Sequence, residues 1–297
     1  MQTNATIDRS KEAQAAQTIK VKPKWVMPVV HTLYYLVMIV FLLFYMLPFW
    51  GTIMTSFKTA ADVSQSTPVQ MPTQWTLEAY AAALKELDVP LLNSVMITIF
   101  GAAGSVFLGS ICAYALSKWK FKLNNVFFIA LVAATYLPFQ AILIPLTKTM
   151  GALGLYDNIW GVVLVHSIFG MPMCTVMMRG YYQDVPDALV RQAMIDGNGV
   201  WAIYRKIVLP NTMIATITTF VFQCTSIWNE MLFALVLTDN TAKPATMALN
   251  GMIGTTSANP NEMMAGAMIL ALPVLILYIF MGKYLISGQM SGAVTAS

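Results

Sequence analysis

Six long stretches without a charged side chain alternate with short charged segments along the chain. They cover residues 25–57, 89–117, 123–147, 158–178, 207–229 and 263–282. Each is at least 20 residues long, and about 20 apolar residues in a helix cross the hydrocarbon core of a bilayer. The pattern therefore predicts an all-α integral membrane protein with six transmembrane helices. In the second stretch, the small residues from Gly101 to Gly109 predict the close approach of another helix.

The charged segment 184–210 is predicted to form an elbow, which we define as two short helices that meet at Gly197. A glycine there can adopt a positive φ and let one helix end while another leaves at an angle. Pro186 near the first helical position, with Asp184 and Asp187 beside it, is typical of a helix start.

The second arm of the elbow has the spacing of an amphipathic helix. Its expected apolar face holds Val200, Ile203 or Tyr204, and Ile207. Pro210 is expected to end this helix because proline lacks the backbone donor and disfavours the helical conformation of the preceding residue.

Composition agrees with a membrane location, since 58% of the 297 residues are hydrophobic and only 10% are charged. If the N-terminus is cytoplasmic, 13 of the 17 lysines and arginines fall on the cytoplasmic side, which leaves Lys58, Lys85, Lys148 and Lys243 outside. Cytoplasmic loops carry the excess of basic residues, so both termini and the elbow are predicted to be cytoplasmic. The net charge of +4 follows from this asymmetry and does not indicate a nucleic-acid partner.

Residues suited to catalysis or metal binding are scarce. His31 and His166 are far apart, and Cys112, Cys174 and Cys224 all fall inside predicted spans. No phosphate-binding loop of the form G-x-x-x-x-G-K-[ST] occurs, so any energy from ATP must come through another polypeptide. We therefore predict a protein that is not an enzyme by itself and holds no metal or cofactor.

The elbow resembles the EAA loop of permease subunits from binding-protein-dependent ABC importers, because Ile195-Asp196-Gly197 and Ile207-Val208-Leu209-Pro210 fit its pattern. Other strings resemble landmarks of the carbohydrate branch, the maltose-permease-like subunits of the second kind. These are LPFWGTIMTSFKT, MPTQWTLEAYAAAL, LLNSVMIT, AYALSKWKF, LPFQAILIPL, LGLYDN and IWNEMLFALVLT, in the expected order.

The resemblance implies a type I ABC importer permease in a prokaryotic cytoplasmic membrane. It implies as partners a cytoplasmic ATPase dimer that binds ATP and magnesium, a second permease in a heterodimer, an extracytoplasmic solute-binding protein and a carbohydrate substrate. The residues that correspond to the ATPase contact are Leu189, Arg191, Gln192, Ala193, Met194, Asp196 and Gly197. Arg191 stands where the family has a glutamate, so a charge pair with the ATPase is reversed or absent.

Polar residues inside apolar stretches are candidates for the substrate pathway, because such residues often face a cavity or the bundle interior. These candidates are Gln140, Gln223, Trp228, Asn229 and Glu230. The structural alternative is that they, like Asn93, form hydrogen bonds between helices and loops.

The chain is expected to divide into a polar tail (1–25), a first transmembrane helix (26–57), an extracytoplasmic segment (58–89), a transmembrane core (90–287) and a C-terminal tail (288–297). Two other functions stay open. A secondary carrier would need internal repeats or an ion-coupling relay, and a non-transporting membrane scaffold would use the elbow only for docking.

Overall fold

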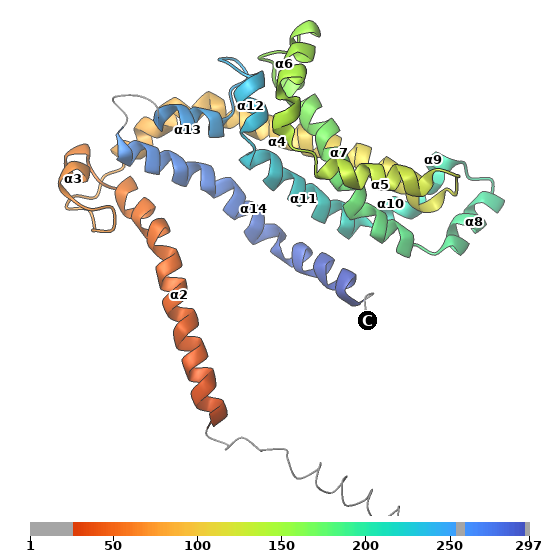
Figure 1. Ribbon diagram of the computed structural model, residues 1–297, viewed down its shortest axis with the longest axis horizontal. Helices are drawn as coiled ribbons and strands as arrows, with labels where there is room; N and C mark the ends of the chain where they lie inside the picture. The colour runs from red at the N-terminus through yellow and green to blue at the C-terminus, as the bar shows by residue number, and fades with distance from the viewer. Residues whose placement is uncertain (1–25, 254–258, 295–297) are drawn as a thin grey trace, which may run out of the picture. The chain divides into compact units, whose positions relative to one another are not determined.

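The computed structural model describes residues 26–253 and 259–294, which form helices and connecting turns with no β-strand among them. The predicted polar tail 1–25 lies outside the described residues. In chain order the helices are α2 (Val26–Ser56), α3 (Ala60–Gln65), α4 (Glu78–Lys118), α5 (Asn124–Thr135), the 3₁₀-helix η1 (Phe139–Ile142), α6 (Leu143–Ala152), α7 (Ile159–Asp184), α8 (Asp187–Ile195), α9 (Val200–Ile203), the π-helix η2 (Tyr204–Val208), α10 (Leu209–Asn211), α11 (Met213–Asn229), α12 (Leu232–Leu237), α13 (Ala245–Ile253) and α14 (Pro260–Val294) (Figure 1).

The chain divides into two compact units at Gly51–Thr52, inside α2. Within the first unit, Phe41, Phe44 and Tyr45 are 68%, 71% and 78% exposed. A helix with apolar side chains exposed along its length is what a lipid environment favours.

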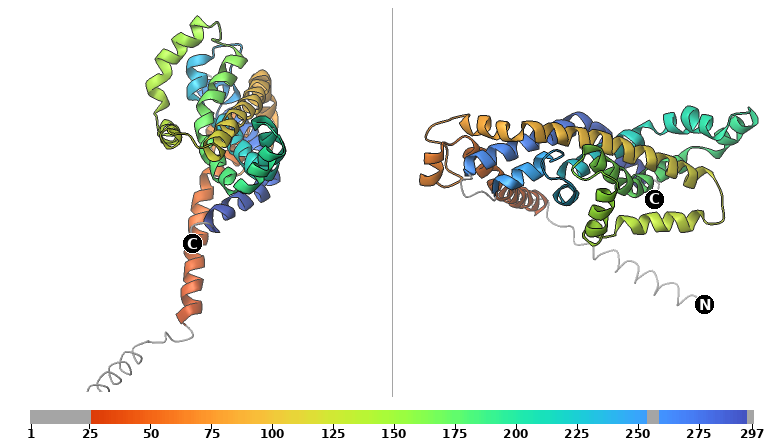
Figure 2. Two further views of the ribbon diagram at one scale, coloured as in Figure 1. Left: turned by 90° about the vertical axis from the view of Figure 1, so that its right-hand side faces the viewer. Right: turned by 90° about the horizontal axis from the view of Figure 1, so that it is seen from above.

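In the second unit, α4 and α7 pack along most of their length, and α11 and α14 pack against α4 (Figure 2). A Cβ atom on Gly109 of α4 would lie 2.5 Å from Cβ of Cys174 and 3.0 Å from the backbone nitrogen of Thr175, both in α7. The close helix approach predicted for the small residues of this stretch is therefore confirmed at Gly109.

Helix α4 begins at Glu78, inside the segment 58–89 that we expected to precede the second span. Ala79, Ala83 and Leu87 share one face of this extension, and they pack with Ala245 of α13 and Ala265 of α14. Burial of this face therefore holds the extension in place. The sequence did not predict it because charged residues on its surface interrupt the apolar pattern. At the other end of the chain, α14 continues to Val294, into the predicted C-terminal tail.

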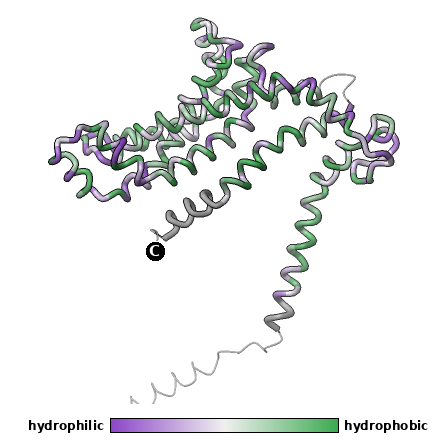
Figure 3. The backbone as a smooth tube through the Cα atoms, turned by 180° about the vertical axis from the view of Figure 1, so that it is seen from behind, coloured by the Kyte–Doolittle hydropathy of each residue, from purple (hydrophilic) through white to green (hydrophobic). Residues whose placement is uncertain are grey.

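Among the described residues, four helices are long and apolar enough to cross a membrane, and the number rises to six if each of two bent pairs is one span. One pair joins residues 124–135 to 139–152 with a bend of 94°, and the other joins 200–211 to 213–229 with a bend of 80°. The first bend lies beside Pro138, which disfavours the helical conformation of the residue before it. The six-span prediction corresponds to the upper number. Hydrophobic residues follow the long helices, whereas hydrophilic residues concentrate near the ends and turns (Figure 3).

Candidate functional site

The first arm of the elbow is α8, and its end has the form predicted from Gly197. Gly197 has a φ of +80°. Its N–H donates to the carbonyl of Met194 at 3.1 Å, and the N–H of Asn198 donates to the carbonyl of Ala193 at 2.9 Å. These are the two hydrogen bonds of a Schellman motif, in which glycine occupies the left-handed position.

The start of this arm differs from the prediction in one respect. Asp184 is the last residue of α7 and does not belong to α8, whose first residue is Asp187. Pro186 occupies the N-cap position of α8 without a side-chain capping hydrogen bond, so only Asp187 lies in the first turn, where its charge favours the helix dipole.

The second arm does not end at Pro210 as predicted. α9 continues through η2 into α10, which contains Pro210, and the bend follows at Thr212. The π-helical turn also changes the expected apolar face. Ile203, Tyr204 and Val208 are buried, whereas Val200 is exposed. One extra residue in the π turn moves the following side chains around the helix, so 3.6-residue spacing fails across it.

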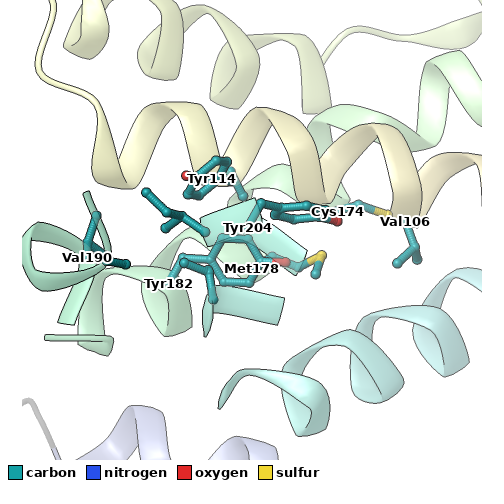
Figure 4. Close-up of a cluster of buried hydrophobic side chains, with 11 residues drawn as sticks. Val106, Tyr114, Cys174, Met178, Tyr182, Val190 and Tyr204 are labelled. Carbon is teal, nitrogen blue, oxygen red and sulfur yellow. The ribbon is translucent and has the colours of Figure 1, made fainter. Parts of the chain in front are cut away.

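The inner face of the elbow packs into a buried cluster shared with α4 and α7 (Figure 4). Its members are Val106, Ala113, Tyr114, Cys174, Met178, Tyr182, Val190, Ala193, Ile203, Tyr204 and Val208. Inside the cluster, the hydroxyl of Ser110 lies 2.6 Å from the hydroxyls of both Tyr182 and Tyr204. α4, α7 and the second arm are therefore joined by apolar packing and by hydrogen bonds protected from water.

Two side chains of α4, Tyr114 and Lys118, also attach the elbow. The hydroxyl of Tyr114 donates to the carbonyl of Val200 at 3.0 Å. Nζ of Lys118 donates to the carbonyl of Val185 and lies 3.1 Å from Oδ1 of Asp187. The hydrogen bond and charge of Lys118 lower the pKa of Asp187 from its ordinary value. Each arm of the elbow is thus connected to the same transmembrane helix.

The outer face of the elbow holds most of the residues predicted to contact the ATPase. Those exposed there are Leu189, Arg191, Gln192, Met194, Asp196 and Gly197. Ala193 differs, because it is only 4% exposed and belongs to the inner cluster. Sequence reasoning missed Ile195 and Trp201, which are 79% and 56% exposed; large apolar residues flanking the turn of a charged segment were the available signal.

The candidates for the substrate pathway have different surroundings. Gln223 is buried and accepts a weak hydrogen bond from the thiol of Cys174 at 3.8 Å. Nε1 of Trp228 donates to the carbonyl of Leu270 at 3.1 Å. Asn229 and Gln140 are exposed. The structure therefore does not gather these five residues into one site.

Glu230 caps α12, because its carboxylate accepts the N–H groups of Leu232 and Phe233 at 2.6 and 3.1 Å. Its Oε2 also lies 3.9 Å from Nε2 of His166 in α7. Both side chains line a cavity of about 10 Å³ together with Thr98 and Trp228, which is room for about one water molecule. The proximity of Glu230 to His166 could not be read from the sequence, where 64 positions separate them.

Asp157, which the sequence did not single out, holds the loop after α12. Its carboxylate accepts hydrogen bonds from the N–H groups of residues 239–242 at 2.9–3.3 Å, the shortest from Asp239. Asn93 donates to the carbonyls of Thr241 and Lys243 at 3.0 Å. Asn93 therefore forms hydrogen bonds between a helix and a loop, which is the structural alternative to contact with the substrate.

No three His, Cys, Asp or Glu side chains in the described part of the chain come together as metal ligands. The absence of a metal or cofactor stays a prediction for the chain as a whole.

Comparison with known proteins decides the family. Residues 105–288 match the family described as the binding-protein-dependent transport system inner membrane component. The chain belongs to this family. It is 42% identical to a probable ABC transporter permease protein of Pyrococcus horikoshii, over 88% of this chain and 96% of that protein.

Two further permeases have named substrates. The xylose/arabinose import permease protein XacI of Haloferax volcanii is 31% identical over 86% of this chain and 90% of its own. The glucose import system permease protein GlcU of Saccharolobus solfataricus is 31% identical over 88% of this chain and 93% of its own. Among solved structures, a bacterial ABC transporter involved in the import of the acidic polysaccharide alginate matches with a TM-score of 0.76 and 24% identity, over 89% of this chain and 99% of that chain.

The permease is thus a non-catalytic inner-membrane component of an ATP-driven transport system, with the type I importer fold. This family works with an ATPase and a binding protein, which confirms the coarse prediction of its partners. Because the chain belongs to this family, the two alternative functions, a secondary carrier and a non-transporting scaffold, are rejected.

Proposed function

We propose that this permease forms half of the translocation pathway of a carbohydrate importer and couples to a cytoplasmic ATPase through the elbow. The relatives named for xylose/arabinose and glucose import support a sugar substrate. The proposal includes a heterodimer with a second permease, a dimer of ATPase subunits that bind ATP and magnesium, and cytoplasmic placement of both termini.

The observation that carries the coupling proposal is the two-sided character of the elbow. Its inner face is buried among α4 and α7, whereas Leu189, Met194, Ile195 and Trp201 are large, apolar and exposed on the outside. Exposed apolar side chains grouped on a soluble segment favour a protein interface. A partner that binds these residues can move α4 and α7 because the elbow is attached to both.

The reversed charge at Arg191 does not oppose this function. Arg191 is exposed, and exposed ion pairs contribute only about 0–1 kcal/mol. Docking through the apolar side chains therefore does not require the glutamate that the family pattern places here.

The test compares Met194→Glu with the matched control Met71→Glu in the reconstituted transporter. Both methionines are exposed, at 40% and 64%, and Met71 lies outside the elbow. A charge at Met194 should abolish most substrate-stimulated ATP hydrolysis and uptake, because burying an unpaired carboxylate in an interface is strongly unfavourable. Met71→Glu should retain uptake. Full coupling in Met194→Glu, with the ATPase still bound, would refute the assignment of the elbow.

Within the pathway, we propose substrate contact first for Gln140 and Asn229, whose side chains are exposed. The hydrogen bonds of Trp228 and Glu230 support a structural role for that pair. Alanine substitution of Gln140 or Asn229 should then raise KM for the sugar without changing the ATPase rate in its absence. Unchanged transport in both variants would place the sugar contacts elsewhere.

A further inference from the structure

A basic cavity lies where the end of α4, the start of α5 and the end of α7 meet. Its volume is about 270 Å³, and its walls include Trp119, Lys120, Lys122, Asn125, Arg179 and Gln183. Three of these residues are cationic and none of the lining residues is a carboxylate. The nearby carboxylate of Asp187 is paired with Lys118, which is not part of the lining.

Arg179, which lines this cavity, has an unused hydrogen-bond donor. Its Nε is buried and has no hydrogen-bond partner among the described residues. Its guanidinium carbon lies 3.9 Å from the centre of the Phe128 ring in α5, which holds the group in place. A buried donor without an acceptor is unfavourable, so an acceptor from outside the chain that reached Nε would remove this cost.

The turn that carries the two lysines is fixed by other contacts. Nδ2 of Asn124 donates to the carbonyls of Leu116 and Trp119, at 3.1 and 2.9 Å. The same residue begins α5, a helix of 12 residues, whose N-terminus adds partial positive charge. Lys120 and Lys122 are themselves exposed, so their amino groups can reach a ligand at the mouth of the cavity.

The apolar surface beside the cavity indicates which class of ligand binds there. On α5, Val126, Phe127 and Ile129 are 60%, 55% and 65% exposed. An exposed apolar helix that begins at a basic cavity offers surface to acyl chains and charge to a headgroup. Basic pockets beside transmembrane helices are known to suit the headgroups of anionic lipids.

We propose that this cavity binds the phosphate group of an anionic phospholipid, with Arg179, Lys120 and Lys122 as its ligands. Guanidinium and ammonium groups provide charge-assisted hydrogen bonds to phosphate oxygens. A free phosphate would satisfy the same donors, but only the lipid also covers the exposed face of α5. Since Lys118 connects α4 to the elbow, a bound lipid would lie beside the segment through which the transporter is coupled.

The experiment uses the intact transporter in nanodiscs of phosphatidylcholine alone or with phosphatidylglycerol. Amine-reactive labelling followed by mass spectrometry measures the protection of Lys120 and Lys122. A third sample contains phosphatidylcholine with inorganic phosphate. Phosphatidylglycerol should protect both lysines more strongly than inorganic phosphate at the same concentration, because only the lipid also packs against α5. Protection by inorganic phosphate alone would overturn the lipid as occupant, and protection by neither would overturn the site.

Variants test the donors by lipid retention in native mass spectrometry. Lys120→Gln with Lys122→Gln alters exposed residues only, so folding should be retained, and each lysine removed should weaken phosphatidylglycerol binding about fivefold. Arg179→Gln should also lose the lipid. The matched control is Arg205→Gln with Lys206→Gln, two exposed cations in η2 that do not line the cavity. Equal retention in all variants, or equal loss in the control, would contradict the assignment.

Discussion

Gly197 determines the angle of the elbow because it alone allows the left-handed turn between α8 and α9. Its φ is +80°, and a Cβ at this position would meet no other atom within 4 Å. Glycine is therefore needed here for its positive φ and not for lack of space. Substitutions at this position test the backbone conformation without disturbing the packing.

We predict that Gly197→Asn retains coupled transport, whereas Gly197→Val lowers the stability of the elbow by about 1–2 kcal/mol, because asparagine tolerates the left-handed region and a β-branched residue does not. Hydrogen exchange of residues 193–200 and substrate-stimulated ATP hydrolysis are the measurements. If valine and asparagine gave equal exchange and activity, the positive φ would not be essential.

Asp157 is the second residue whose chemistry fixes a loop. Partial burial would raise the pKa of its carboxyl group, but hydrogen bonds from the N–H groups of residues 239–242 outweigh this effect and hold the pKa well below its usual range. The carboxylate thus stays charged in the folded protein at pH values where an ordinary aspartate is protonated.

We therefore predict that the loop 239–242 stays protected from hydrogen exchange as the pH falls from about 6 to about 4, the ordinary pKa of aspartate. A lowered folded pKa contributes stability above the unfolded pKa, and this contribution is lost only as the pH falls through the folded value. Asp157→Asn should raise exchange in this loop at every pH, because an amide provides fewer acceptors. Exchange that already rises at pH 5, or is unchanged in Asp157→Asn, would be inconsistent with this anchor.

At the scale of elements, the bundle depends on how closely α4 and α7 approach. We predict that Gly109→Ala destabilises the protein by about 1–3 kcal/mol, the usual effect of overpacking, because its Cβ would lie 2.5 Å from Cβ of Cys174. Gly151→Ala in α6 is the matched control, since no atom lies within 4 Å of its added Cβ. Thermal unfolding in detergent measures both variants, and equal melting temperatures would contradict the close packing.

The helices with irregular geometry are those in which the sequence prediction failed. Pro210 was expected to end the second arm, but η2 precedes it and the helix continues to Asn211. The N–H of Leu209 donates to the carbonyl of Tyr204, five residues earlier. Once the chain adopts this wider turn, the missing donor of proline no longer forces an end to the helix, and the apolar residues follow a different spacing.

For the whole molecule, the proposed orientation predicts opposite sides for Met71 and Met194. In a background without cysteines, a membrane-impermeant thiol reagent added to intact cells should label Met71→Cys and not Met194→Cys, which should react only after permeabilisation. Both methionines are exposed, so accessibility to the reagent depends on the membrane. Labelling of Met194→Cys from outside would reverse the proposed topology.

The sequence by itself determined the long apolar helices and the break at Gly197, which follow from hydropathy and backbone preference over a few neighbouring residues. It also indicated the family, through the resemblance of the elbow and the other quoted strings to known permeases. Tertiary structure alone decided the inward position of Ala193, the approach of Glu230 to His166, the anchoring of a loop by Asp157, and the cavity around Arg179. Each of these depends on residues far apart in the chain, whose approach is set by packing between helices and not by any local pattern.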